Sequence, residues 1–300
     1  MVSMAPAELL QQLVNALSLG SLYAMLALGL AIVFGVMKLL NFAYGELITV
    51  CAYGVYVMVS SGQSFLVGAV VGVIAATAVS VLTERVAFRP LRGAPFITVL
   101  FSSFAVAVII QNLIRQLVSP RPRGFATPGF LDDLVSIGGL NVGVLPLITI
   151  ATAVTLMAGI VALLQRTKVG LAMRAAAQDF ENARLMGISA NRVILLAFAL
   201  SGFVAGIAGV LWGARTGAAT PAMGFVPVLK AFVATVIGGL GNLRGAVLGG
   251  MVLGVVEVTL VVFLPNGAAP FVDAFALLAV VAVLYFRPQG LIGVAAEVRT

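Results

Sequence analysis

The sequence contains no histidine and a single cysteine, Cys51. Acid–base catalysis by histidine is therefore excluded, an internal disulfide is impossible, and a zinc or haem site of the usual kind is not expected. The chain also lacks the Gly-Lys-Ser/Thr ending of a phosphate-binding loop. We expect no cofactor in this chain, and any ATP that drives it must be bound by another subunit.

Charge is scarce as well. Only 9% of the residues are charged and 62% are hydrophobic, whereas soluble domains have about 25% charged and 45–50% apolar residues. So apolar a chain requires a lipid bilayer as its solvent. The net charge of +7 does not indicate nucleic-acid binding, because the basic residues fall in short gaps between apolar runs, where they orient membrane proteins.

The apolar runs predict an all-α, polytopic bundle of eight to ten spans that forms a single domain, residues 1–300. A spanning helix needs about 20 apolar residues. The first run is long enough to tilt or to break near Gly20, and the seventh is too short to span the membrane unaided. The candidate runs are approximately residues 9–37, 42–60, 65–83, 96–118, 142–164, 193–213, 226–237, 246–264 and 271–286.

The basic residues predict the orientation of these spans. Most of them, including Lys38, the arginines of residues 85–92, Arg244 and the tail residues Arg287 and Arg299, fall on one side of the alternating runs. The other side has Arg121, Arg123 and Arg215. The positive-inside rule places the first side in the cytoplasm, so we expect the N-terminus outside and the C-terminus inside.

Glycines at four-residue spacing lie inside the apolar runs, for example Gly202 with Gly206 and Gly250 with Gly254. Small residues at this spacing let helix backbones approach closely in lipid. We therefore interpret them mainly as helix-packing residues.

The longest polar gap, residues 165–192, belongs to the cytoplasmic side. Its core, residues 170–187, predicts one short amphipathic helix, with Arg174 and Glu181 away from the apolar face. That face carries Ala172, Ala176, Phe180, Ala183 and Gly187. Such a helix either docks into a groove of a partner protein or lies at the level of the lipid headgroups.

Polar side chains also interrupt the apolar runs themselves, at Asn41, Tyr44 and Glu46 and at Glu257 in the middle of a span. Ionisable groups at membrane depth are costly and face a cavity or a partner. Lys38 and Arg244 are candidate counter-charges for the two carboxylates. The carboxylates either face a cavity or a partner in this way, or Glu46 is interfacial and Glu257 is a structural hydrogen-bonding group.

A glycine-rich stretch between two apolar runs contains Gly238, Gly239 and Gly241. Glycine allows positive φ angles, and non-helical backbone at membrane depth is tolerated where it is buried in protein or lines a cavity. We expect these three residues to be buried in protein or to line a cavity, although packing explains each of them singly.

Several stretches, in order and over nearly the whole chain, resemble the branched-chain amino-acid ABC transporter permeases of the LivH type. One departure from the family pattern is Tyr44, where a histidine is expected, so a proton-carrying role there is disfavoured. The stretches are Gly20-Ser-Leu-Tyr-Ala-Met-Leu-Ala-Leu-Gly29, Phe34-Gly35, Leu40-Asn-Phe-Ala-Tyr-Gly-Glu46, Gly170-Leu-Ala-Met-Arg-Ala175 through Leu185-Met-Gly187, Gly238-Gly-Leu-Gly-Asn-Leu-Arg-Gly-Ala-Val-Leu-Gly-Gly250 and Phe286-Arg-Pro-Gln-Gly-Leu-Ile-Gly293.

The resemblance implies a permease subunit of the bacterial inner membrane that works by alternating access and is not itself an enzyme. It implies as partners a second, homologous permease subunit, two cytoplasmic ATP-binding subunits and a periplasmic substrate-binding protein. It favours ATPase docking by residues 165–192, with Ala176, Phe180, Ala183 and Gly187 as the contact face and Arg174 and Glu181 beside it. For such a permease we expect the translocation route or its gate at Asn41, Tyr44, Glu46, Gly238, Gly239, Gly241 and Glu257.

The sequence leaves three other functions open. An ion-coupled secondary transporter would use Glu46 and Glu257 as proton carriers. A permease of the same family could serve urea or short amides. A membrane enzyme is disfavoured, because the spans have few clustered polar groups.

Overall fold

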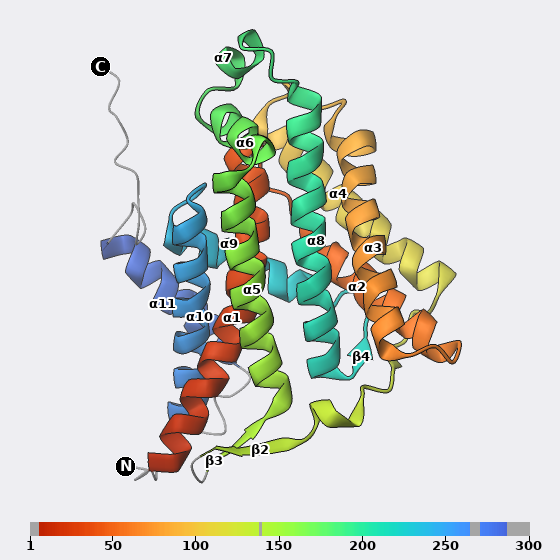
Figure 1. The fold of residues 1–300 in the computed structure, drawn as a ribbon, viewed down its shortest axis with the longest axis vertical. Helices are drawn as coiled ribbons and strands as arrows, with labels where there is room; N and C mark the ends of the chain where they lie inside the picture. The colour runs from red at the N-terminus through yellow and green to blue at the C-terminus, as the bar shows by residue number, and fades with distance from the viewer. Residues whose placement is uncertain (1–5, 138–139, 265–270, 287–300) are drawn as a thin grey trace.

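A computed structural model describes residues 6–137, 140–264 and 271–286, and within these ranges the chain is a bundle of helices (Figure 1). The helices are α1 Pro6–Met37, α2 Tyr44–Ser60, α3 Phe65–Thr83, α4 Phe96–Leu117, α5 Val144–Arg166, α6 Lys168–Gln178, α7 Phe180–Leu185, α8 Ala190–Thr216, α9 Phe225–Gly238, α10 Leu243–Phe263 and α11 Val272–Phe286.

The shorter elements lie at the ends of these helices. A π-helical turn, η1 Glu84–Phe88, continues α3, and a 3₁₀ turn, η2 Gly129–Leu131, follows α4. Two antiparallel strand pairs close the loops at one end of the bundle: β1 Arg123–Gly124 with β4 Ala218–Ala219, and β2 Leu134–Ile137 with β3 Leu140–Gly143.

The predicted polytopic, all-α architecture is confirmed. Six of the described helices are long and apolar enough to cross a membrane, and α2 and α9 are shorter apolar helices. The predicted short seventh run is α9, with 14 residues. The first run does not break at Gly20, since α1 is one helix of 32 residues. At 1.5 Å per residue it is longer than the roughly 30 Å hydrocarbon core, so it must tilt or protrude.

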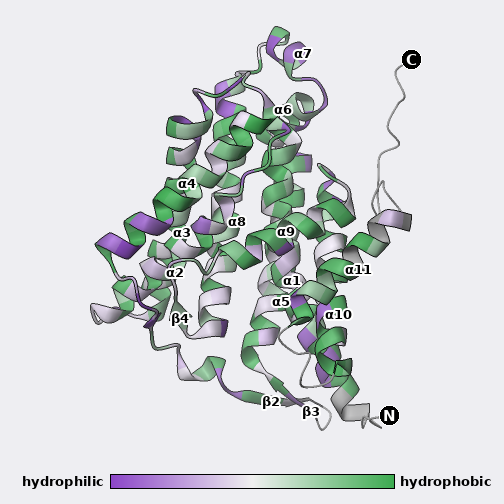
Figure 2. Ribbon diagram, turned by 180° about the vertical axis from the view of Figure 1, so that it is seen from behind, coloured by the Kyte–Doolittle hydropathy of each residue, from purple (hydrophilic) through white to green (hydrophobic). Residues whose placement is uncertain are grey.

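The basic residues of the predicted cytoplasmic loops and those of the predicted outer loops lie at opposite ends of the bundle. This agrees with the prediction for the loops that the structure describes. Figure 1 shows α6 and α7 at the end where α1 finishes, and β2 and β3 at the end where α1 begins. Hydrophilic residues gather on α7 and on the loops, and hydrophobic ones line the helices between (Figure 2). Arg287 and Arg299, and the stretch after Phe286, lie outside the described residues.

The centre of the bundle is α1, which packs against α5, α8, α9 and α10. Glycines allow the closest of these contacts. A Cβ atom on Gly250 would lie 2.3 Å from the Ala24 nitrogen, and one on Gly254 would lie 2.3 Å from the Gly20 Cα. The spacing read from the sequence therefore does mark helix packing.

This contact gives a stability prediction. We expect Gly250→Val to lower the free energy of unfolding by about 3 kcal/mol or to prevent folding, because the new side chain overlaps the α1 backbone and neither helix can give way. Thermal unfolding in detergent, followed by size-exclusion chromatography, measures the effect. The control is Gly159→Ala, since a Cβ at Gly159 meets nothing within 4 Å. Equal stability of the two variants would contradict the packing assignment.

Candidate functional site

Two of the helices, α2 and α9, begin inside the bundle and not at its ends (Figure 1). Their first residues touch: a Cβ on Gly45 would lie 2.4 Å from the Gly224 carbonyl oxygen, and the Gly224 amide donates to the Thr49 hydroxyl over 3.2 Å. The chain leading into each helix is non-helical. Helices that start at membrane depth are typical of the substrate and ion sites of transporters.

The predicted pathway residues of α2 and the turn before it are enclosed at this junction. Asn41, Tyr44 and Glu46 are all buried, and Glu46 is 1% exposed, so the interfacial interpretation of Glu46 is wrong. The Glu46 Oε1 accepts a hydrogen bond of 2.7 Å from Gln111 Nε2 of α4. The phenol of Tyr44 fills the space beside Gly29 of α1, where a Cβ would lie 2.1 Å from its oxygen.

Three polar atoms at this junction have no hydrogen-bond partner among the described residues: Asn41 Oδ1, the Tyr44 hydroxyl and Glu46 Oε2. A buried polar atom without a partner destabilises the fold by roughly 1–3 kcal/mol. Such atoms commonly mark places that are satisfied in another state or by a ligand or water. The structure therefore brings these three predicted residues together, but it does not open them to a channel.

Glu257 belongs to a separate cluster of ionised and polar side chains that joins four helices. The ammonium of Lys230 in α9 lies 2.8 Å from Glu257 Oε1 of α10 and 2.8 Å from Asp273 Oδ1 of α11. It also donates to the hydroxyl of Tyr23 in α1 over 3.0 Å. The same hydroxyl donates to Glu257 Oε2 over 2.9 Å. Each charge at this depth has an opposite charge in contact.

The counter-charge of Glu257 was predicted wrongly. Lys38 lies against the ring of Phe34, with its nitrogen 6.0 Å from the ring centroid, and Arg244 is exposed in the first turn of α10. The partner is Lys230, which the sequence analysis missed. The available signal was that Lys230 is the single charged residue of an apolar helix, and such a charge needs a partner at membrane depth.

The glycines of residues 238–241 form the tight turn between α9 and α10. Gly239 and Gly241 have φ angles of +105° and +85°, which other residues rarely adopt. A Cβ on Gly238 would lie 2.0 Å from the Gly245 carbonyl oxygen. Gly241 also lines a hollow of about 250 Å³ together with Arg174, so the turn faces the cytoplasmic helices.

The cytoplasmic loop differs from the single helix that was predicted over residues 170–187. Asp179 ends α6 and caps α7, because its side chain accepts from the Asn182 amide over 3.0 Å. An aspartate with extended backbone is a strong N-cap, and it starts a new helix in a new direction. The loop is therefore two helices, and α6 is itself capped by the Thr167 hydroxyl, which accepts from Gly170.

This break changes which side chains of the loop face outward. Ala176 and Ala183 are 4% and 7% exposed and pack into the chain's own core, so these two cannot form part of an outward contact face. Arg174, Glu181 and Gly187 are exposed and Phe180 is half-buried. Leu185 and Met186, which were not predicted as contact residues, are 83% and 84% exposed at the tip.

Arg92 joins the end of α3 to the start of α8, the helix that follows the two cytoplasmic helices. Its guanidinium donates to Glu84 of the π-helical turn and to Asn191 in the first turn of α8, and Glu84 is itself buried. Arg92 and Phe180 line two adjoining hollows of about 580 and 700 Å³. The start of α8 is thereby tied to the π-helical turn that continues α3.

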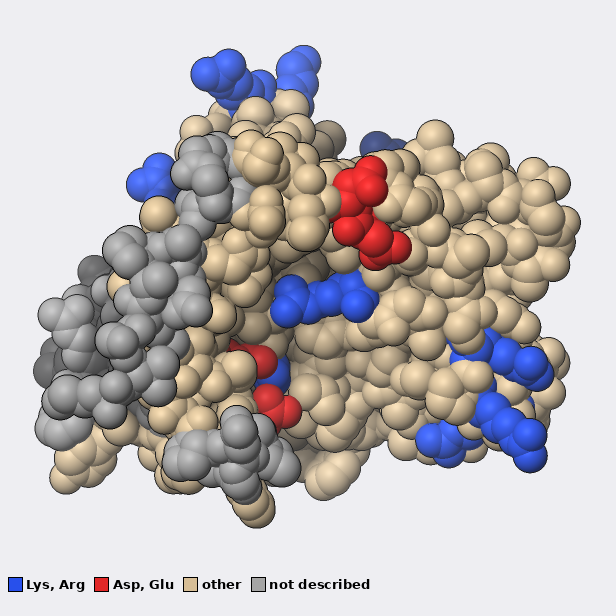
Figure 3. All heavy atoms as spheres, turned by 90° about the horizontal axis from the view of Figure 1, so that it is seen from below, with Lys and Arg blue, Asp and Glu red and all other residues tan. Residues whose placement is uncertain are grey.

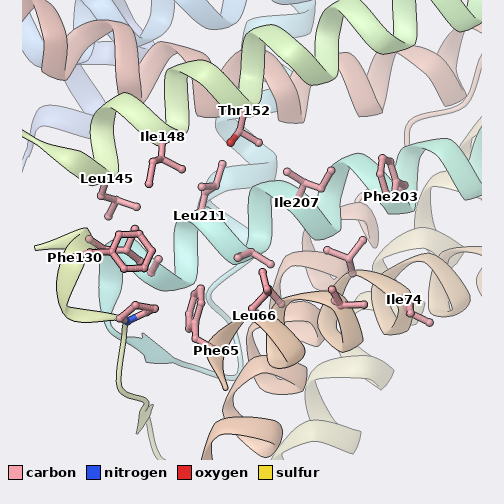
Figure 4. A pocket seen from close by; sticks show the side chains of 17 residues that line it. Phe65, Leu66, Ile74, Phe130, Leu145, Ile148, Thr152, Phe203, Ile207 and Leu211 are labelled. Atoms are coloured by element: carbon pink, nitrogen blue, oxygen red, sulfur yellow. The ribbon is translucent and has the colours of Figure 1, made fainter. Parts of the chain in front are cut away.

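A different, apolar groove of about 640 Å³ runs between α3, α5 and α8 (Figure 4). Among its lining residues Thr152 has the single polar side chain. The groove can accommodate apolar chains, but it has no group that could neutralise a charged ligand.

Comparison with known proteins places this architecture in a family. Residues 12–285 match the family described as branched-chain amino acid transport system / permease component. The chain belongs to this family. Membership and the six apolar helices make it a multi-pass protein of the bacterial inner membrane.

Curated relatives match over nearly their full length. The permease protein BraD of a high-affinity branched-chain amino acid transport system from Pseudomonas aeruginosa is 33% identical over 95% of both chains. LivH of the corresponding system of Escherichia coli is 31% identical over 95% of both chains. These relatives are transport permease proteins and not enzymes.

Two solved structures share the fold. A metal-chelate type ABC transporter in an inward-facing conformation has a TM-score of 0.55 at 14% identity, with 95% of this chain and 91% of the other covered. PsaBC from Streptococcus pneumoniae, solved with a Fab, has a TM-score of 0.50 at 13% identity and 92% coverage of both chains.

The cluster around Lys230 gives a second stability prediction. We expect Lys230→Met to lower the free energy of unfolding by about 3 kcal/mol, because it leaves carboxylates without a counter-charge at membrane depth. Adding Glu257→Gln should recover part of the loss, since one uncompensated charge is then removed. Melting temperatures of the purified variants measure this, with Thr259→Val of α10 as the control. A double variant that is less stable than Lys230→Met would contradict the ion pair.

Proposed function

We propose that this chain is the membrane-spanning subunit of an ABC importer for branched-chain or related amino acids, and that separate subunits hydrolyse the ATP. The observation that carries the proposal is the similarity to amino-acid permeases, 31–33% identity over 95% of the chain. The expected partners are a second, homologous permease, two cytoplasmic ATP-binding subunits and a periplasmic substrate-binding protein.

The two cytoplasmic helices are the proposed docking site for the ATPase. Leu185 and Met186 project fully from the tip, and large exposed apolar side chains of this kind anchor protein interfaces. Arg174, Phe180, Glu181 and Gly187 of the same two helices and the turn after them are the further proposed contact residues. Ala176 and Ala183 contribute by fixing the element to the bundle, because both are buried under it.

The proposed transport route passes the two places where polar groups meet at membrane depth. One is the junction of α2 and α9 with Asn41, Tyr44 and Glu46, and the other is the cluster that contains Glu257. Gly238, Gly239 and Gly241 form the turn that links α9 to the cytoplasmic end of α10. We propose that movement of α6 and α7 reaches α9 through this turn and alternates access to the route.

The alternative hypothesis of an ion-coupled secondary transporter is less well supported than the importer. Lys230 balances the charge of Glu257, and Glu46 is enclosed and hydrogen-bonded to Gln111, so both carboxylates already have a partner in the protein. A substrate such as urea is less suitable than an amino acid, because an uncharged molecule gains little from a cluster of paired charges.

Co-purification and transport together test the proposed function. Affinity purification of this chain in mild detergent should recover two ATP-binding subunits and a second permease in near-equal amounts. The reconstituted complex, with its binding protein, should then accumulate labelled leucine only when ATP is supplied. Recovery of the chain alone, together with uptake that follows an ion gradient, would overturn the proposal.

The docking assignment gives a mutational prediction. We expect Leu185→Asp with Met186→Asp to reduce recovery of the ATP-binding subunits by about tenfold or more, because a charge replaces an apolar anchor in a desolvated contact. Co-purification without the binding protein measures this. The control is Leu134→Asp, which alters an exposed apolar residue at the opposite end of the bundle. Normal recovery with the tip variant, or equal loss with the control, would contradict docking at the tip.

A further inference from the structure

The cluster around Lys230 has one partner that differs from the rest. A lysine ammonium has three hydrogen-bond donors, and here they meet Glu257, Asp273 and the hydroxyl of Tyr23. Tyr23 is fully buried, and Lys230 and Glu257 have side chains that are 12% exposed, whereas that of Asp273 is 58% exposed. Asp273 is therefore the partner that can leave Lys230 for another ligand without disturbing the enclosed three residues.

The side of the cluster that meets the surface is Asp273, whose side chain is 58% exposed. Figure 3 views the end opposite the cytoplasmic helices and shows acidic and basic side chains facing one another within a hollow of that surface. The exposed Asp273 is in the first turn of α11. A small ligand that enters from this end would thus meet Asp273 before the enclosed residues.

We propose that the Lys230–Asp273 ion pair is a binding site for the charged head of an α-amino acid, a role that rests on the function proposed above. The ligand's carboxylate takes the place of Asp273 on the ammonium of Lys230. The freed carboxylate of Asp273 accepts hydrogen bonds from the ligand's ammonium. The ligand is inserted into the ion pair, and no covalent bond or proton transfer is involved.

Charge balance gives this site its selectivity. Lys230, Glu257 and Asp273 together have a formal net charge of −1. Binding of a zwitterion leaves this net charge unchanged, and every charged group still has an oppositely charged partner. A ligand without the carboxylate leaves Lys230 without a replacement partner, and one without the ammonium leaves Asp273 unpaired. Two new ion pairs form only when the ligand carries both charges, so the site selects the amino-acid head and not the side chain.

The exchange also explains why binding would be weak and reversible. One ion pair is replaced by two of the same kind, while the ligand loses its hydration and its freedom of motion, so the net gain is small. A site on a transport route must bind firmly enough to admit the ligand and weakly enough to release it. We therefore expect half-saturation on the order of 1 mM leucine.

The chain provides its own reporter for this binding. Trp212 is the only tryptophan of the sequence, and its ring centroid lies 6.4 Å from that of Tyr23. Titrating the purified full chain in detergent with L-leucine should change the Trp212 emission in a saturable way. Leucinamide, which lacks the carboxylate, and 4-methyl-2-oxopentanoate, which lacks the ammonium, should each require at least about tenfold higher concentrations.

Variants decide whether the signal comes from this site. Asp273→Asn, at an exposed position where folding is tolerant, should abolish the response, Asp273→Glu should retain it, and the control Thr259→Val should leave it unchanged. An unaltered response in Asp273→Asn, an equal response to all three compounds, or no response in the unmodified chain would overturn the proposal. ATP-driven leucine uptake without a Trp212 response would reject this site and leave the proposed function intact.

Discussion

The close approach of α1 and α10 is the contact on which the rest of the structure depends. Gly20 and Ala24 lie against Gly254 and Gly250, and Tyr23 sits within that stretch of α1. Because no side chain separates the two backbones, the Tyr23 hydroxyl reaches the carboxylate of Glu257. In lipid, where no hydrophobic force brings helices together, this packing and the polar contacts that it permits hold the bundle.

The features that were predicted correctly from the sequence follow from requirements that a lipid bilayer places on any spanning segment. An apolar run such as α3 must be a helix, since its backbone groups have no other partners in the bilayer. Arginines such as Arg89 and Arg184 mark the cytoplasmic end for an equally general reason. The short seventh run was recognised because 14 residues cannot cross a hydrocarbon core.

The candidate site was predicted less well because its partners are distant in the chain. Lys230 contacts Tyr23, which is 207 positions away, and no local pattern encodes that pairing. A local effect was underestimated at Asp179, where capping prevailed over the helical period of the surrounding alanines. The burial of Ala183 followed from that break and could not be foreseen from a single continuous helix.

The junction of α2 and α9 gives the bundle a natural hinge at mid-depth. Each helix keeps its own backbone hydrogen bonds, and among the described residues the bond from the Gly224 amide to Thr49 joins the two starts. Tilting one half against the other would therefore break about one hydrogen bond, worth roughly 1 kcal/mol. Bending an unbroken span by the same angle would disrupt several backbone hydrogen bonds, so the break between the helices lowers the hydrogen-bonding cost of a tilt at this depth.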